Sequence, residues 1–227
     1  MITVAAIALG LWLALLLVPW QPWRCRERLE TANTPSTRND FTVLIPARNE
    51  ADVIDATLNA LAISAPHATV IVVDDESKDS TAQTVKTNRH PSVRLLAGSP
   101  PPTGWSGKLW ALEQGLREVT TPRILLLDAD IALAPGMIAA LENQADSGYE
   151  LVSVLAEPCL RGAWGRWLLP AFVYFFKLIY PFALANRESS RVAAAAGGVV
   201  LVEREALLRA GAFGAWRDAL IDDCTLA

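Results

Sequence analysis

The stretch Arg123–Asp130 reads RILLLDAD, an apolar run that leads directly into Asp128 and Asp130. A short apolar run of this kind predicts a buried strand, and the two acids then stand at its carboxyl end. An unpaired carboxylate in an apolar setting is very costly, so both side chains need a cation nearby. We therefore expect Asp128 and Asp130 to face positive charge at one edge of a sheet.

On both sides of this stretch, short apolar runs alternate with helical patterns. Strands are expected at 41–46, 69–75, 92–98, 123–130 and 149–157, and helices at 50–63, 79–88, 107–119 and 135–146. A last strand of small residues leads into a helix at Glu203. Such alternation predicts βαβ units, so the fold class is α/β with a mostly parallel, Rossmann-like sheet.

The composition excludes several classes of protein. The 227 residues are 52% hydrophobic and 19% charged with a net charge of -4, which gives no basic field for nucleic acid. Cys25, Cys159 and Cys224 lie far apart, which argues against a zinc site or a disulfide framework and fits a reducing compartment. Neither His67 nor His90 has a metal-ligand spacing.

The first residues have the pattern of a membrane anchor. Ile2–Trp20 carries no charged side chain, and 19 helical residues cover about 30 Å, the thickness of the hydrocarbon core. Arg24, Arg26 and Arg28 follow at once, which predicts that the rest of the chain is cytoplasmic. We expect a single span (1–23) in the inner membrane, a basic and polar linker (24–40) and one catalytic domain (41–227). A cleaved signal peptide and a buried core helix are the weaker alternatives.

The segment 163–185 is intensely apolar and aromatic, but Arg166, Pro170, Lys177 and Pro181 interrupt it. Two prolines and a central lysine disfavour a second span. We expect an interfacial segment that lies on the bilayer, with an ordinary core helix as the alternative.

Further acids stand where strands end. Asp74 and Asp75 close one strand, and Asp222–Asp223 lies close to the last residue, while Lys108 begins a helix. Ligands of open α/β sheets bind beyond the carboxyl ends of the strands, and helix N-termini favour anions. Carboxylates of this kind suit Mg²⁺ or Mn²⁺ bound together with substrate phosphates. The set predicts glycosyl transfer from a nucleotide sugar, with the metal and Lys108 stabilising a departing diphosphate.

Lys108 and several other polar or aromatic residues near these acids also have a structural interpretation. Asp79 is typical of a helix N-cap, and Asn49 is first a cap and only second a ligand. A single lysine such as Lys108 is usually solvated. Trp105 and Trp110 either stack on a sugar or pack in the protein. Convergence of acids from separate strands on one sheet edge favours the functional interpretation.

The motifs VLIPARNE, VVDDESKDST, LLLDAD, the GG at 197–198 and the DD at 222–223 resemble, in this order, those of family 2 glycosyltransferases of the GT-A fold. The resemblance covers 41–227. The stretches GWSGKLWALEQGL, PAFVYFFKLIYPFALAN, RVAAAAGG and ALIDDCTLA are similar to hopene-associated glycosyltransferases of bacterial hopanoid gene clusters.

The resemblance implies a role for each matching position. Asp130, with Asp128, would hold Mg²⁺ or Mn²⁺. Asp223 would be the base beside Asp222, and the implied outcome is inversion at the anomeric carbon. The implied donor-binding residues are Pro46, Arg48, Asn49, Glu50, Asp74, Asp75, Lys108, Asp128, Gly197 and Gly198.

The implied partners are a nucleotide sugar, with UDP as the expected carrier, and a lipid acceptor such as a hopanoid or another polyprenoid. Family members continue past the DD motif, so we expect a C-terminal part of the fold to be missing. A non-catalytic nucleotide-sugar-binding protein is therefore the alternative. A nucleotidyltransferase is disfavoured, because IPARNEADV (45–53) lacks the glycines of a phosphate loop.

Overall fold

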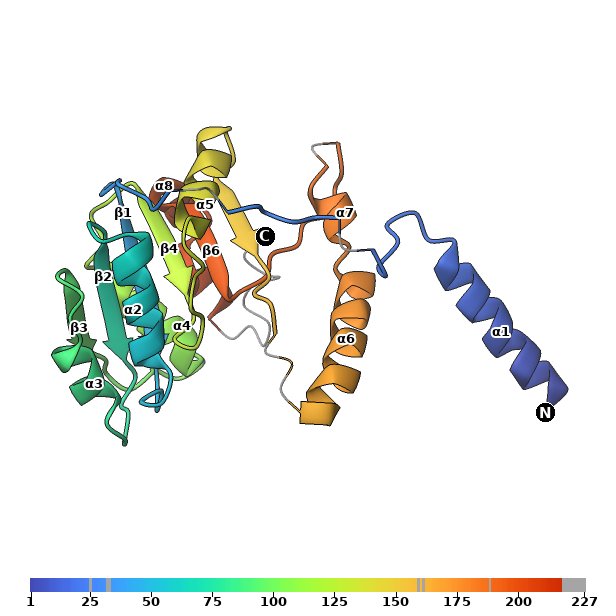
Figure 1. Cartoon of the computed structure of the whole chain (residues 1–227), viewed down its shortest axis with the longest axis horizontal. Coiled ribbons are helices and arrows are strands. Elements are labelled where there is room, and N and C mark those ends of the chain that lie inside the picture. Colours follow the sequence, from blue (N-terminus) through green and yellow to red (C-terminus); the bar gives the residue numbers. More distant parts are fainter. Residues whose placement is uncertain (25, 32–33, 159, 161, 188, 218–227) are drawn as a thin grey trace. The chain divides into compact units, whose positions relative to one another are not determined.

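The structure is a computed structural model, and it describes the chain except residues 25, 32–33, 159, 161, 188 and 218–227 (Figure 1). The chain forms two compact units. The smaller unit consists of Met1–Arg28 and Glu157–Ala194, and the larger unit consists of Leu29–Ala156 and Ala195–Ala227.

The larger unit is built on a six-stranded sheet with the order β3-β2-β1-β4-β6-β5. The strands are β1 (Phe41–Ala47), β2 (Thr69–Asp74), β3 (Val93–Ala97), β4 (Arg123–Leu127), β5 (Leu151–Val154) and β6 (Val199–Glu203). β1 to β4 run parallel, whereas β6 is antiparallel to both β4 and β5. The predicted mostly parallel sheet is confirmed.

Successive strand residues point to opposite sides of the sheet, so both of its faces carry apolar side chains. Helices cover both faces. In β1, Val43 and Ile45 belong to the core on one face, while Leu44 belongs to the core on the other. The first core is closed by α2 (Ile54–Ser64), α3 (Thr81–Thr87) and α5 (Met137–Asp146), and the second by α4 (Gly107–Leu116), α8 (Arg204–Arg209) and the 3₁₀ helix η1 (Ala212–Trp216). Gly115 lets α4 approach the sheet closely, since a Cβ there would lie 2.3 Å from Leu44 Cδ1.

The strand order reverses direction between β1 and β4. From β1 the chain builds outward through β2 to β3, and then returns to place β4 on the other side of β1. In open α/β sheets the crevice at such a switch point, outside the carboxyl ends of the strands, is where ligands bind. The segments that follow Ala47 and Leu127 lie there.

Several boundaries differ from the predicted ones. The helix expected from 50 begins at Ile54, and the strand expected over 149–157 is limited to Leu151–Val154. The small residues before Gly197 have no regular structure, and the strand begins only at Val199. Part of the expected linker is attached to the larger unit, because Ser36 is buried and its hydroxyl donates to Glu142 Oε1 at 3.0 Å.

The smaller unit contains α1 (Ile2–Leu16), α6 (Gly162–Ile179) and α7 (Phe182–Ala185). The 15 residues of α1 cover about 22 Å, less than the hydrocarbon core of about 30 Å. Among the described residues, one helical segment, Gly162–Ala185, is long and apolar enough to cross a membrane, and it contains both α6 and α7. The N-terminal span therefore stays a prediction.

Candidate active site

Asp75 lies at the switch point between an arginine and the start of a helix. Its side chain is buried, and its Oδ2 lies 3.2 Å from Arg48 Nη1. A Cβ on Gly107 would lie only 2.7 Å from the same oxygen, so α4 begins directly against this carboxylate. The positive end of the helix dipole favours the negative charge. Asp75 Oδ1 is buried without a hydrogen-bond partner within the described part of the chain, whereas Asp74 Oδ1 accepts from the Ser77 backbone N–H at 3.2 Å.

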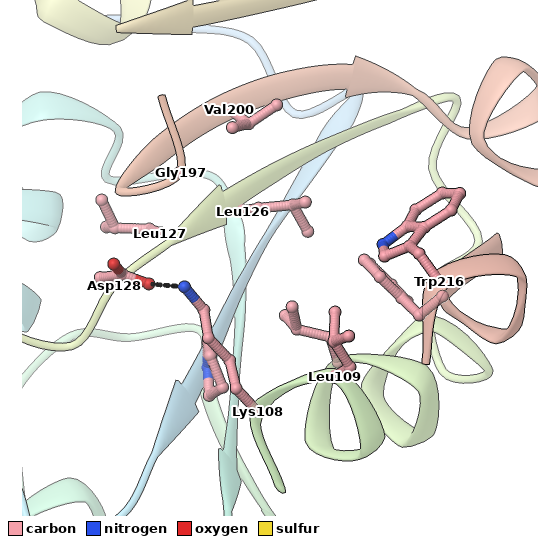
Figure 2. Close-up of a pocket in the computed structure, with 11 residues that line it drawn as sticks. Lys108, Leu109, Leu126, Leu127, Asp128, Gly197, Val200 and Trp216 are labelled. Carbon is pink, nitrogen blue, oxygen red and sulfur yellow. Dashed lines mark ion pairs between the residues drawn. The ribbon is translucent and has the colours of Figure 1, made fainter. Parts of the chain in front are cut away.

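Lys108 and Asp128 form an ion pair at the mouth of a pocket. Lys108 Nζ lies 2.9 Å from Asp128 Oδ1, and each side chain is about a third exposed (Figure 2). The empty space in and in front of the pocket is about 350 Å³, open solvent included. Its polar end is formed by Lys108, Asp128, Pro46 and Gly197, and its apolar floor by Leu109, Leu112, Leu126, Leu127, Val200, Phe213 and Trp216.

The two glycines before β6 come close to Asp128, although 69 positions separate Asp128 from Gly197 in the sequence. The antiparallel pairing of β6 with β4 brings them together, and the Asp128 N–H donates to the Gly198 carbonyl at 3.0 Å. A Cβ on Gly198 would lie 2.4 Å from Ile131 Cδ1 and 3.8 Å from Asp128 Oδ2. A side chain at Gly198 would overlap Ile131, so the close packing of this segment requires glycine there.

Negative charge gathers beside this ion pair. The pKa of Glu50 is raised, first by burial and then by repulsion from Asp130, Asp79 and Asp128. No group of three or more His, Cys, Asp or Glu in the described residues could hold a metal by itself. A cation that binds through one or two carboxylates and takes its other oxygens from phosphates fits this acidic edge. Asp128 and Asp130 are the carboxylates of this edge that could hold such a cation.

The segments that follow β1 and β2 are interlocked. Asn49 has a positive φ of 58°, its N–H donates to Ser77 Oγ at 2.9 Å, and its Oδ1 accepts from the Lys78 N–H at 2.8 Å. The Glu50 N–H donates to Thr81 Oγ1 at 2.8 Å. Asn49 thus joins two loops and does not cap α2. The contributions of Ser77 and Thr81 had no signal in the sequence beyond the density of turn-forming residues in DDESKDST.

Asp79 and Trp110 have structural contacts. Asp79 Oδ1 accepts from the Thr81 N–H at 2.9 Å, but the N-cap position of α3 is Ser80, so the predicted N-cap was wrong by one residue. Trp110 Nε1 donates to the Ser99 carbonyl at 2.9 Å, its ring lies 5.1 Å from that of Trp105, and Arg117 lies over it. Of the two interpretations of Trp110, packing accounts for its contacts.

Asp222 and Asp223, the implied base and its neighbour, lie outside the described residues. Phe213 and Trp216, which form part of the apolar floor of the pocket, were not predicted to line the site. No local pattern in the sequence marks them, because they reach the pocket only through the packing of η1 on α4 and α8.

The family model described as Glycosyl transferase family 2 matches residues 42–209, from β1 through α8. The chain belongs to glycosyl transferase family 2. A 4,4'-diaponeurosporenoate glycosyltransferase of Staphylococcus aureus is 31% identical over 120 residues, which are 52% of this chain and 32% of the relative. The alignment thus spans about a third of that relative.

Solved structures agree with this family membership. A mannosyltransferase from Pyrobaculum calidifontis, in complex with GDP-Man and Mn²⁺, matches with a TM-score of 0.67 and 25% identity over 98% of this chain and 61% of its own. TarS of S. aureus in complex with UDP has a TM-score of 0.50 at 16% identity, over 75% of this chain and 48% of its own, which supports the fold alone. The GT-A-like fold predicted for this family 2 member is confirmed.

Proposed function

We propose that this family 2 member is a metal-assisted, inverting glycosyltransferase that moves a sugar from a nucleoside diphosphate sugar to a lipid at the cytoplasmic face of the inner membrane. The observation that carries the proposal is the ion pair of Lys108 with Asp128, beside Asp130 and the buried Asp75, at the switch point of the sheet. Cationic and anionic groups at the carboxyl ends of the strands support the binding of a diphosphate with its metal.

The donor lies along the carboxyl ends of β1, β2 and β4. Asp75 Oδ1 accepts a hydrogen bond from the nucleoside, because this buried oxygen has no partner within the described residues. Lys108 and the N-terminus of α4 bind the diphosphate. Asp74, Asn49 and Glu50 border the nucleoside, and Pro46, Arg48, Gly197 and Gly198 complete the site. The donor is a UDP-sugar or, as in the Pyrobaculum relative, GDP-mannose.

Transfer requires one proton acceptor and stabilisation of one leaving group. Asp128 and Asp130 would hold Mg²⁺ or Mn²⁺, which would supply positive charge to a departing diphosphate. Lys108 adds a second positive charge on the same side. Asp223, beside Asp222, takes the proton of the acceptor hydroxyl as its oxygen bonds to the anomeric carbon. The bond from this carbon to the diphosphate breaks on the opposite side, so the configuration inverts.

The acceptor is a lipid, with a hopanoid or another polyprenoid as the preferred class. Two observations support a lipid. The S. aureus relative is named for glycosylation of 4,4'-diaponeurosporenoate, and the smaller unit here exposes long apolar helices. α1 and the apolar residues that follow it serve as the N-terminal anchor.

The test is transfer of radiolabelled sugar from UDP-sugars and from GDP-mannose into extracted lipid by the full chain in membranes. We expect metal-dependent labelling that Asp223→Asn abolishes, whereas Asp218→Asn, the neighbouring control, retains it. Full activity of Asp223→Asn would refute the base assignment. Donor binding without transfer to any lipid would support a non-catalytic nucleotide-sugar-binding protein instead.

A further inference from the structure

One face of α6 is apolar and exposed along its whole length. We call this face, formed by Trp164, Trp167, Leu168, Phe172, Phe175 and Ile179, the apolar stripe. Apart from the adjacent pair Trp167 and Leu168, its residues recur at intervals of three or four, which places them on one side of a helix. Trp164 and Trp167 are about four-fifths exposed. An exposed apolar surface of this extent marks a site of interaction.

The lysine of α6 does not belong to this stripe. Lys177 is 7% exposed, and its Nζ donates to Glu27 Oε2 at 3.1 Å and to the Arg24 carbonyl, all within the smaller unit. Burial favours a raised pKa for Glu27, but a backbone hydrogen bond and Lys177 outweigh it and lower that pKa. The charge of Lys177 is therefore neutralised inside the unit, and it is not part of the exposed face.

The charge of the smaller unit indicates its partner. The unit contains eight Lys or Arg and three Glu, a net charge of +5, while the whole chain carries -4. α6 itself contains no acidic residue, and its Arg166 is exposed in the first turns. Apolar side chains that include tryptophan, set in a basic unit, fit the interface of a bilayer with anionic lipids.

We propose that α6 lies in the plane of the membrane surface, with the apolar stripe buried in the outer acyl region of an anionic bilayer. The difference between the two faces of the helix favours this orientation over a span, because a spanning helix is apolar all round. Arg166 then reaches the lipid phosphates, while its aliphatic part stays among apolar side chains. The proposal concerns a surface separate from the donor site, so the two stand or fall independently.

The test is the membrane depth of labels along the stripe. The full chain, with Cys25, Cys159 and Cys224 replaced by serine, receives single spin-labelled cysteines at positions 168, 172, 175 and 179. It is reconstituted in phosphatidylcholine vesicles with about a third phosphatidylglycerol. An in-plane helix holds all four labels at one depth, about 5–10 Å below the headgroups. A spanning helix would separate the first and last labels by about 16 Å along the membrane normal.

A gradient of depth would overturn the proposal, and so would labels that stay in water, which would indicate a protein partner. A second variant tests the stripe itself. We expect Phe172→Glu with Phe175→Glu to move the label at position 168 out of the acyl region. The control is Ile63→Glu, an equally exposed apolar residue on α2, and it should leave that depth unchanged. Circular dichroism and gel filtration in detergent serve as the check that both variants are folded.

Discussion

Replacement of Gly107 by alanine should impair donor binding while the fold is retained. The new Cβ would lie 2.7 Å from Asp75 Oδ2, whereas ordinary contact begins at 3.4 Å, so the oxygen must retreat by about 0.7 Å. Asp75 has little room for this movement, because it is 4% exposed and already lies 3.2 Å from Arg48. The displaced carboxylate is the group that we assign to the nucleoside.

The magnitude follows from two opposing effects. Alanine is the better helix former by up to about 1 kcal/mol, so the free energy of unfolding should change little. Misplacement of a binding group by about 1 Å can reduce function by as much as a hundredfold. We therefore expect donor affinity to fall by between about tenfold and a hundredfold.

Calorimetric titration of the donor with Mn²⁺ measures this loss. Gly214→Ala is the matched control, since its Cβ would meet only Trp105 ring atoms at 3.8 Å and should not alter affinity. In an Asp75→Ala background, Gly107→Ala should have almost no further effect, because the group that it displaces is gone. Unchanged affinity in the single variant, or fully additive losses in the double variant, would refute the reasoning.

Three further predictions concern charge and packing. Lys108→Met removes the partner of Asp128 and should weaken donor binding by about tenfold or more, measured by calorimetry against the control Lys86→Met; equal affinities would contradict it. Burial raises the pKa of Glu142 in the folded protein, so its ionised form destabilises the fold. This destabilisation grows as the pH rises above the pKa of about 4.3 that the group has in the unfolded chain. Denaturant unfolding should therefore show Glu142→Gln to be more stable than the wild type at pH 7 but not near pH 4, and an equal gap at both would be evidence against this. Gly115→Ala should destabilise the larger unit by about 1–3 kcal/mol, because the new Cβ would overlap Leu44. Thermal unfolding measures this change, and a variant as stable as the wild type or more stable would contradict the prediction.

The sequence was sufficient to predict the sheet and the place of the acids. β1 and β4 are short apolar runs whose residues are buried on both faces, so their composition alone marks them. Because parallel strands end at the same sheet edge, the positions of Asp75 and Asp128 follow from the strand ends.

Features that depend on tertiary packing were not predictable. The run that forms β6 reads the same for either strand direction, so its antiparallel pairing with β4 was not foreseen. The contact of Gly107 with Asp75 joins residues 32 positions apart, and Trp216 reaches the pocket only by the packing of η1. The sequence left three interpretations of 163–185 open, namely a span, an interfacial segment and a core helix. It could not show that Lys177 is neutralised, because its ion-pair partner Glu27 lies 150 positions away.

In the proposed function, Asp128 and Asp130 hold a divalent metal together with the diphosphate of a nucleotide sugar. The most direct test is calorimetric titration of UDP- and GDP-sugars into the full chain in detergent, with Mn²⁺ and then with EDTA, for the wild type and Asp130→Ala. We predict binding that requires the metal and that the variant loses. Binding of equal affinity in EDTA, or an Asp130→Ala variant that binds as the wild type does, would contradict the account.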